Sequence, residues 1–405
     1  MNSAAGPLPV TVLNGFLGAG KTTLLQSLLV QARSFPEVQL GVIVNEMSTL
    51  DVDGRILDTT EVLSRQDRFF VSIPAGSISG PEGLAHFNDA VAKFQEHGAT
   101  HIIIETSGSA HPWPLLEAIR THDGLDLRGF LSVVDTVTLT QDHDLGRAIV
   151  PAASRNLASG QRGIENLLAE QIMFANRILL NKMDRVTMDV LRQVAEAIHP
   201  INPGAEILGM KWGNVKLANV LDIPPYDHHR VATLGAELTE WDQTHATSSM
   251  ASAADYRIDS TVISDPRPFH PQRLWDVYNH YLGEGIYRSK GFFWLPTRDR
   301  LQLLWNQTAG SVGLEIVNYW KVATLEDESL NLSPEERDEM RRRLHGLSPE
   351  FGDRHCHLTV IGDRDGLETF ANALRDCLCT EQEVALWKSG HIFDDPWPKT
   401  TTQVS

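Results

Sequence analysis

The sequence predicts an α/β protein: a domain built on a mainly parallel sheet, followed by a smaller α+β domain. Two observations predict it: short β-branched segments alternate with helical patterns in the first half of the chain, and a glycine-rich loop directly follows the first of these segments. Strands that alternate with helices are typical of a parallel sheet covered on both faces. From changes in pattern we expect a first domain over 8–222, a linker over 223–254, a second domain over 255–390 and a tail over 391–405.

The strands expected in the first domain are short, apolar and mostly β-branched segments: 9–13, 39–45, 69–73, 100–105, 129–135 and 177–181. The helices expected there carry apolar residues at helical spacing: 84–96, 112–120, 163–175 and 187–198. The last helix ends before Pro200, because proline cannot continue a helix.

The chain changes character over 222–254, where two prolines and the polar run 244–252 replace the apolar pattern. This composition favours a linker that can contain a short helix. Beyond it the expected strands are 256–263, 291–295, 312–320 and 357–361, and the expected helices are 271–281 and 367–378. We expect residues 396–405 to be mobile, because chain ends are rarely held in place.

The composition is that of an ordinary globular protein, with 42% hydrophobic and 21% charged residues, which excludes a disordered chain. A net charge of −17 disfavours binding to the phosphate backbone of nucleic acids. The first residues lack the features of a signal peptide, and no apolar run is long enough to span a bilayer. Three cysteines, all late in the chain, are typical of a reducing compartment. We therefore expect a cytoplasmic protein without a nucleic-acid or membrane partner.

The glycine-rich loop matches the phosphate-binding motif G-x-x-x-x-G-K-[ST] without a mismatch. The residues expected at the phosphates are Gly15, Gly18, Ala19, Gly20, Lys21, Thr22 and Thr23. Glycines let the backbone bend tightly and bring bare N–H groups to the phosphates, and the following helix points its positive end at the same anion. We expect the Lys21 ammonium to reach the β- and γ-phosphates and the Thr22 hydroxyl to hold Mg²⁺.

A second nucleotide motif, N-K-x-D, follows the predicted strand 177–181. Asp184 can accept two hydrogen bonds from the Watson–Crick edge of guanine, whereas adenine would leave its carboxylate unpaired. Asn181 would brace the loop or contact the base, and the Lys182 stem can lie over the base. The pattern therefore predicts selectivity for GTP.

An acidic residue, Glu105, ends the predicted strand 100–105. Such a carboxylate can hold Mg²⁺ through a water molecule, and it can also be a surface residue at a sheet edge. Gly108 can offer its N–H to the γ-phosphate, so the segment after Glu105 is a candidate nucleotide-sensitive switch. Asp135 also ends a predicted strand, and there we favour a cap on the following turn.

In this order, these motifs resemble those of the CobW family of P-loop GTPases, whose members act as metallochaperones or metal-insertion factors. Residues 42–54 resemble the family's switch segment V-N-E-F-G-E…D-G, and residues 105–112 resemble its E-T-S-G-x-A-x-P segment. In the second domain, 267–271 and 288–294 are similar to the family's C-terminal signatures. The resemblance covers both domains, 8–390.

The resemblance implies a P-loop GTPase domain with a mainly parallel sheet, followed by a smaller α+β C-terminal domain. It implies that the protein binds GTP with Mg²⁺, hydrolyses GTP slowly, and couples the nucleotide state to the maturation or metal loading of a client metalloprotein. Catalysis would rest on positioning and charge neutralisation around Lys21 and Glu105. Glu46 is the candidate for orienting the attacking water.

The chain departs from the family at its metal motif. The family usually carries C-x-C-C after the switch segment, and the matching stretch here, 76–80, holds no cysteine. Thr49 replaces the second glutamate of the switch segment. A zinc, cobalt or copper site built on thiolates cannot exist there, because serine hydroxyls stay protonated near neutral pH. We therefore expect no tightly bound transition metal in the first domain.

By the family pattern, the weak transition-metal candidates that remain are Glu46 and His122, with His111 and His86 as looser ones. Two or three nitrogen and oxygen ligands could hold a metal only weakly. We favour ordinary surface or hydrogen-bonded roles for these histidines.

Two groups late in the chain also contain metal-ligating residue types. His355 and His357 alternate along a predicted strand and so share one face, and Cys377 and Cys379 close a helix. Neither group has the paired spacing of a zinc site, so core or surface roles are favoured.

Two alternatives stay open at this point. Without the family's cysteines, the protein could be a nucleotide-controlled binding or folding factor that carries no metal. A P-loop kinase is a weaker alternative, because the N-K-x-D motif and the lack of a recognisable lid argue against it.

Overall fold

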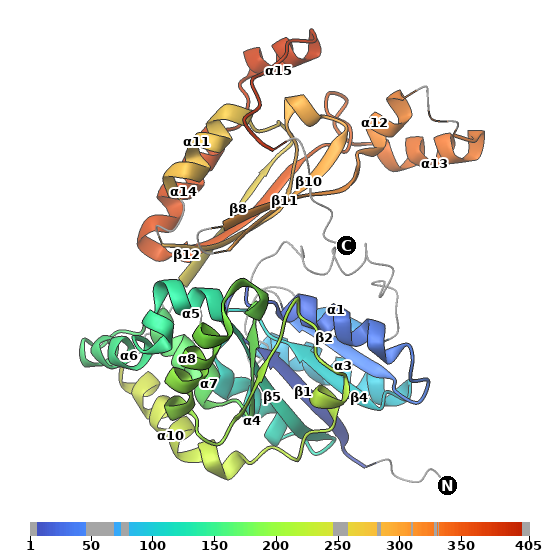
Figure 1. The fold of residues 1–405 in the computed structure, drawn as a ribbon. Helices are drawn as coiled ribbons and strands as arrows, with labels where there is room; N and C mark the ends of the chain where they lie inside the picture. The colour runs from blue at the N-terminus through green and yellow to red at the C-terminus, as the bar shows by residue number, and fades with distance from the viewer. Residues whose placement is uncertain are drawn as a thin grey trace. The chain divides into compact units, whose positions relative to one another are not determined.

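A computed structural model describes residues 6–45, 69–73, 81–245, 258–281, 285–308, 311–327, 330 and 332–398. The chain divides into two compact units, Met1–Ile258 and Asp259–Ser405 (Figure 1). The segment from Glu46 and the 76–80 stretch, on which the predictions about the switch and the missing cysteines fall, lie outside the described residues.

The first unit is built on a seven-stranded sheet in the order β3-β2-β4-β1-β5-β6-β7, in which every paired strand runs parallel to its neighbour. The strands are β1 (Leu8–Asn14), β2 (Leu40–Asn45), β3 (Phe70–Ile73), β4 (His101–Glu105), β5 (Leu125–Asp135), β6 (Arg177–Asn181) and β7 (Glu206–Gly209). Because all of them point the same way, their carboxyl ends lie along one edge of the sheet, which we call the carboxyl edge.

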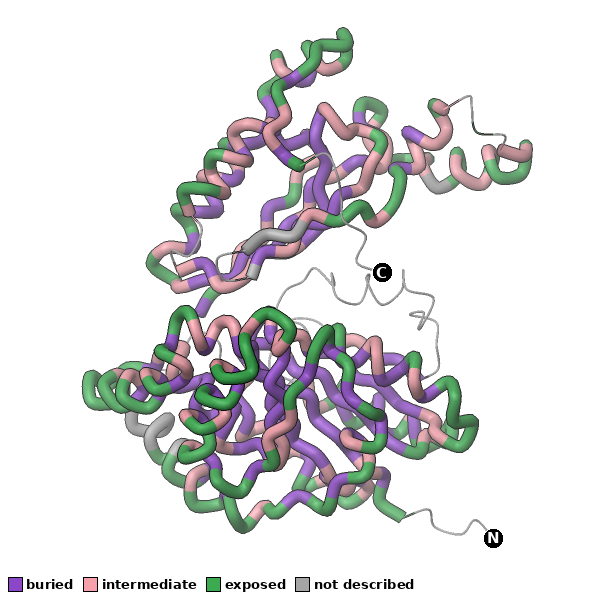
Figure 2. The backbone as a smooth tube through the Cα atoms, in the orientation of Figure 1, coloured by how far each residue is buried: buried purple, intermediate pink, exposed green. Residues whose placement is uncertain are grey.

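Helices cover both faces of this sheet, as Figure 2 shows by the buried strands between them. They are α1 (Lys21–Ala32), α3 (Pro81–Glu96), α4 (Pro112–Arg120), α5 (Thr136–Asp142), α6 (Ile149–Ala158), α7 (Ile164–Met173), α8 (Met188–Ile198), α9 (Ala218–Leu221) and α10 (His228–His245). Ile102 and Ile104 of β4 pack into one core cluster, with Phe87 of α3, whereas Ile103 packs into a second cluster, with Leu24 of α1. The alternation along one strand therefore builds two cores.

The six strands and four helices predicted for the first unit are confirmed, with ends that differ by a few residues. The sequence pattern missed α5, α6, α9 and β7; α5, α9 and β7 are short, whereas α6 has 10 residues. It also placed a linker over 223–254, but this range contains α10, and Tyr226 and Val231 are buried in the first unit's core. These residues therefore pack as part of the first unit and do not form a free connector.

The second unit carries a five-stranded sheet in the order β11-β10-β9-β12-β8. Its strands are β8 (Ile258–Asp265), β9 (Ile286–Phe293), β10 (Leu301–Thr308), β11 (Ser311–Tyr319) and β12 (Cys356–Asp363). The pairs of β9 with β10 and β12, and of β10 with β11, are antiparallel. Its helices are α11 (Pro271–Tyr281), α12 (Lys321–Glu326), α13 (Pro334–Leu344), α14 (Arg364–Asp376) and α15 (Glu381–Lys388). The predicted smaller α+β unit is confirmed.

Tryptophans dominate the core of the second unit. Trp294 and Trp305 are fully buried, and Trp397 from the far end of the chain packs against Trp305 with ring centroids 5.9 Å apart. Asp395 accepts hydrogen bonds from Arg298 and Thr297. The prediction of a tail from residue 391 is therefore wrong for residues 393–397, because a buried aromatic ring and an ion pair hold them in the core.

None of the helices within the described ranges combines the length and the apolar character needed to cross a membrane.

Candidate nucleotide-binding site

The phosphate loop, residues 15–20, connects the end of β1 to the start of α1 at the carboxyl edge. Gly15 and Gly20 have φ angles of 143° and 104°, which side chains rarely adopt. A Cβ atom on Gly15 would lie 2.2 Å from the carbonyl oxygen of Val133, and one on Gly20 would lie 2.2 Å from Nδ2 of Asn181. The loop therefore follows its path only with glycine at both positions.

Lys21 opens α1 and is 5% exposed. Its Nζ donates to the carbonyl oxygens of Gly15 (2.8 Å) and Phe16 (3.3 Å), so the ammonium spans the loop. No acidic residue lies in the first turn of α1, so no side chain of the helix itself neutralises its positive end. A buried ammonium, a helix N-terminus and loop N–H groups together form an anion-binding site.

Thr22 and Glu105 lie next to each other at the carboxyl edge, because β4 pairs with β1. The Thr22 hydroxyl donates to Oε1 of Glu105 over 2.6 Å, and Glu105 is 4% exposed. A hydroxyl and a carboxylate oxygen are the hard ligands that Mg²⁺ prefers, so this pair fits a magnesium ion. The alternative of a surface glutamate at a sheet edge is wrong, since β4 lies inside the sheet and Glu105 is buried.

Gly108 lies directly against the phosphate loop. A Cβ atom there would come within 2.6 Å of Leu17 Cδ2 and 2.8 Å of the Leu17 backbone nitrogen. Only glycine allows this approach, which brings the 105–112 segment beside the loop.

The N-K-x-D segment is hydrogen-bonded to the phosphate loop. Asn181 is 3% exposed, and its Nδ2 donates to the carbonyl oxygen of Ala19 over 2.8 Å. Lys182 has a left-handed backbone (φ 60°), and its Nζ lies 2.6 Å from Oδ2 of Asp135. Asp184 is exposed on the short turn that follows. The arrangement leaves the Asp184 carboxylate accessible and the Asn181 amide inside the site.

Asp135 has a structural role, as predicted. Its Oδ1 accepts from the backbone nitrogens of Val137 and Thr138, which caps α5. Its ion pair with Lys182 was not predicted, and it joins the ends of two neighbouring strands.

The sequence analysis missed the loop after β7. Gly213 donates its backbone N–H to Oδ1 of Asn181 over 3.4 Å and packs against the backbone of Thr23 and Leu24, so the loop lies against both nucleotide motifs. Trp212, with φ 54°, is 65% exposed in this loop. The signal that could have found it is a Lys-Trp-Gly-Asn turn directly after a short apolar run.

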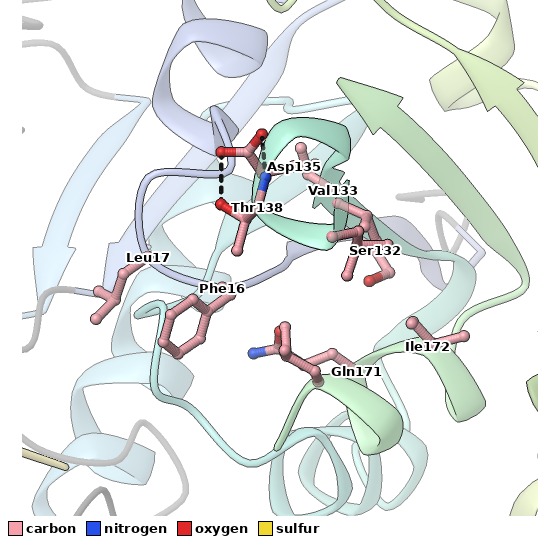
Figure 3. Close-up of a pocket in the computed structure, with 11 residues that line it drawn as sticks. Phe16, Leu17, Ser132, Val133, Asp135, Thr138, Gln171 and Ile172 are labelled. Atoms are coloured by element: carbon pink, nitrogen blue, oxygen red, sulfur yellow. Dashed lines mark hydrogen bonds between the residues drawn. The ribbon is translucent and has the colours of Figure 1, made fainter. Parts of the chain in front are cut away.

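Figure 3 shows a small cavity next to the phosphate loop. Phe16 and Leu17 line one side, Ser132 and Asp135 of β5 another, and Gln171 of α7 points toward Phe16. Its volume of about 20 Å³ holds a water molecule and is too small for a nucleotide base. The cavity thus marks where α7 meets the loop rather than a second ligand site.

Two of the histidines considered as metal ligands lie away from such a site. His122 lies between α4 and β5, and its Nδ1 accepts from the backbone nitrogen of Gly124, whose carbonyl oxygen bonds Leu8 at the start of β1. This is the opposite edge of the sheet, about 15–20 Å from the strand ends. The candidacy of His122 is therefore wrong. His86 is exposed on α3.

The late histidines and cysteines have ordinary roles. His355 bonds Ser264, and its ring lies 4.9 Å from that of His357 on the same face. Burial raises the pKa of the Cys377 and Cys379 thiols to about 12. Across the ranges that the structure describes, no three His, Cys, Asp or Glu side chains come together in a way that could hold a metal ion.

Two family models match the chain. The CobW/HypB/UreG nucleotide-binding domain matches residues 9–209, and the cobalamin synthesis protein cobW C-terminal domain matches residues 258–378.

Individual relatives are similar over different shares of the chain. "Zinc-regulated GTPase metalloprotein activator 1" of Dictyostelium discoideum is 28% identical over 400 residues, which cover 94% of this chain and 82% of that protein. "Zinc chaperone CobW" of Sinorhizobium sp is 32% identical over 203 residues, which cover 48% of this chain and 56% of that protein. The Zn(II)-bound YjiA GTPase from E. coli is 18% identical with a TM-score of 0.34, covering 93% of this chain and 100% of that one.

Proposed function

The chain belongs to the CobW/HypB/UreG family of P-loop GTPases, and we propose that it binds GTP with Mg²⁺ at the carboxyl edge and couples hydrolysis to the maturation of a client metalloprotein. One observation carries the nucleotide part of the proposal: the phosphate loop and the first turn of α1 that follows it are hydrogen-bonded to the two other motifs. Thr22 bonds Glu105, and Ala19 bonds Asn181. The groups that a nucleotide and its metal ion require thus lie around one loop.

At the phosphate end, the Lys21 ammonium and the N–H groups of the loop would bind the β- and γ-phosphates. Thr22 and Glu105 would hold Mg²⁺, Thr22 directly and Glu105 through a water molecule. When bound, Mg²⁺ would neutralise charge on the two phosphates. Lys21 would exchange its bonds to the loop carbonyl oxygens for bonds to phosphate oxygens. Hydrolysis would then rest mainly on positioning and charge stabilisation.

At the base end, the exposed Asp184 carboxylate would accept from guanine, and the Lys182 stem would lie over the base. The ion pair with Asp135 supports this, because it fixes the Lys182 side chain in one direction. Trp212 is exposed in a loop whose Gly213 bonds Asn181, so its ring is a candidate for stacking on the same base. Glu46 directly follows β2, which ends at the carboxyl edge, and it remains the proposed residue for orienting water.

Nucleotide choice tests the proposal. Calorimetric titration of the full chain should give GTP an advantage over ATP of about 2–3 kcal/mol, roughly 30- to 150-fold, because adenine leaves the Asp184 carboxylate unpaired. Asp184→Asn should remove this preference and favour xanthine nucleotides. Asp189→Asn, the same change at an aspartate 80% exposed on α8, is the matched control and should have no effect. Equal affinities for GTP and ATP in the wild type would contradict the assignment.

The client part of the proposal comes from the family and from the relatives, whose names mention zinc and metalloprotein activation. A specific observation favours a second candidate, a nucleotide-controlled binding or folding factor that carries no metal. The sequence has no cysteine before Cys356, so a thiolate site cannot form in the first unit. Without soft anionic ligands, a site would bind Zn²⁺ weakly. Its Zn²⁺ affinity could therefore differ little between the GTP-bound and GDP-bound states.

Competition against a chromophoric zinc chelator, with and without a non-hydrolysable GTP analogue, separates the two candidates. We expect no tight one-to-one binding and no large gain with the analogue. Tight binding that is lost in Glu46→Ala but kept in His122→Ala would instead establish a direct metal-carrying role. His122→Ala is the control because His122 lies at the opposite edge of the sheet.

A further inference from the structure

Two consecutive residues of α7, Glu170 and Gln171, contact the 105–112 segment. They are 4% and 1% exposed. Gln171 Nε2 donates to the carbonyl oxygen of Gly108 over 3.3 Å, and Glu170 Oε2 lies 3.2 Å from Nε2 of His111. One turn of α7 therefore holds the segment at two points three residues apart.

The contact with His111 has a defined polarity. His111 Nδ1 accepts from the backbone nitrogen of Trp113, which caps α4, so the ring proton must sit on Nε2. The protonated Nε2 then faces Glu170 Oε2 at 3.2 Å, a close polar contact without the geometry of a hydrogen bond. Burial, followed by the nearby Arg162 guanidinium, lowers the pKa of His111 to about 3, which is consistent with a neutral ring.

Glu170 is itself anchored. Nη2 of Arg162, which is 1% exposed, lies 3.4 Å from its Oε1. The carboxylate thus has a guanidinium charge near one oxygen and the polar edge of a neutral imidazole near the other, and both lower the cost of burying its charge. The tether to the 105–112 segment is therefore built on a fixed group inside the unit.

Gly108, which Gln171 contacts, lies directly against the phosphate loop. A glycine backbone is freer than any other, and Gly108 packs against Leu17 of the phosphate loop at a distance that no Cβ would allow. In Figure 3, Gln171 projects toward Phe16 of the same loop. The Gly108 carbonyl belongs to the Gly108–Ser109 peptide, so its bond to Gln171 fixes the path of the chain directly after the residue whose N–H is expected at the γ-phosphate.

We propose that Gln171 and Glu170 are positioning residues, which hold residues 108–111 against the phosphate loop, where the Gly108 N–H is expected to meet the γ-phosphate of GTP. The inference rests on the proposed function. GDP lacks a γ-phosphate, so these contacts should raise the affinity for GTP and leave the affinity for GDP unchanged. In this way α7 contributes to the discrimination between the two nucleotides. A glutamine bond of this kind corresponds to a change in affinity of about 3- to 10-fold.

The test compares Gln171→Ala with Gln95→Ala in the full chain. Gln95 is the matched control, because its Nε2 also donates to a glycine carbonyl oxygen, that of Gly124, over 3.2 Å and far from the phosphate loop. Calorimetry with Mg²⁺ should show that Gln171→Ala lowers the affinity for a non-hydrolysable GTP analogue about 3- to 10-fold and leaves the affinity for GDP unchanged. GTP turnover should also fall, whereas Gln95→Ala should change neither quantity.

Gln171→Met keeps the approximate size of the side chain and removes the donor without adding a charge, so it separates the hydrogen bond from packing. It should reproduce the effect of Gln171→Ala. An equal loss of GDP and analogue affinity in both variants would overturn the inference and show a merely structural role, and so would unchanged affinities. Failure of the proposed function would look different, since the wild type would then not prefer GTP over ATP.

Discussion

The two units bury polar side chains in different places. In the first unit, five strands end on a buried polar residue: Asn14, Asn45, Glu105, Asp135 and Asn181. In the second unit, Ser289 of β9 and Gln307 of β10 are buried within their strands and bond to each other. The same kind of burial therefore builds a site at one edge in the first unit and completes a core in the second.

The polar strand ends of the first unit and the buried polar residues of the second unit should differ in whether they affect activity or stability. The polar strand ends of the first unit meet loops, and several of their partners are groups that a nucleotide would also contact. In the second unit, Ser289 bonds Gln307 and the buried Trp305 ring, so these polar groups are satisfied within the core. Changes at the carboxyl edge should thus alter activity before stability, and changes in the tryptophan core should do the reverse.

The largest expected effect is on stability, from Trp305→Ala. Trp305 is 1% exposed, its Nε1 donates to Ser289 over 2.7 Å, and its ring packs against Phe293 and Trp397. Removing it should lower the free energy of unfolding of the second unit by about 3–5 kcal/mol. Six of the nine tryptophans lie beyond residue 258, so fluorescence during urea unfolding reports mainly on this unit.

Trp212→Ala is the control, because that side chain is 65% exposed and should affect stability little. The affinity for GTP should be unchanged in Trp305→Ala under conditions where the second unit is still folded. Loss of both stability and nucleotide binding would show that the two units are not separable in this way.

The next effect is on activity, from Lys21→Ala. Removing the ammonium should lower GTP turnover by at least about 100-fold, as for other preorganised charge-stabilising groups. Circular dichroism should stay unchanged, since the Lys21 ammonium bonds the loop carbonyl oxygens of Gly15 and Phe16 and fills no space in the hydrophobic core. Thr22→Ala should weaken Mg²⁺-dependent binding with the fold intact. Turnover at the wild-type rate in Lys21→Ala would contradict the proposed mechanism.

The contrast between the units also explains what could be predicted from the sequence. A polar residue that ends a β-branched run is visible in a linear pattern, so Glu105 and the segment starting at Asn181 were found. The Lys182–Asp135 ion pair could not be found, because it joins residues 47 positions apart. Glu170 and Gln171 look like ordinary polar positions on a helix, and only the packing of α7 brings them to Gly108.

The second unit was harder to predict for the same reason. β10 reads Leu-Gln-Leu-Leu-Trp-Asn-Gln-Thr, and its polar residues hide the strand pattern although Gln307 is buried through its bond to Ser289. Trp397 lies beyond the last predicted element, and only long-range packing shows that it belongs to the core. Local pattern therefore predicted the strand-end site and missed contacts made over long separations.

The smallest expected effect is a pH dependence confined mainly to the first unit. His101 is 5% exposed, and burial, followed by the Arg128 charge, lowers its pKa to about 4. Thr11 Oγ1 donates to the carbonyl oxygen of Val220, so it must accept the proton on His101 Nε2. The neutral ring is therefore built into the contact between β1 and β4.

The direction of the effect follows from proton binding. Between pH 6.5 and 4, His101 is protonated in the unfolded chain and neutral in the folded unit. The contribution of His101 to the free energy of unfolding is therefore fully present above pH 6.5 and is lost as the pH falls. At pH 5 the free energy of unfolding is therefore lower than at pH 7 by about 1–2 kcal/mol from this one histidine. Glu383 in the second unit behaves differently, because the Arg273 guanidinium lowers its pKa to about 2, so its contribution is lost only below about pH 4.5.

Calorimetric unfolding at pH 7 and pH 5 measures how far the free energy of unfolding falls between the two pH values. His101→Gln keeps a donor for Thr11 and cannot take up a charge, so its unfolding free energy should fall less between the two pH values than that of the wild type. His97→Gln, an exposed histidine on the neighbouring turn, is the control and should leave the wild-type pH dependence in place. If His101→Gln showed the full wild-type dependence, the buried histidine would not be its source.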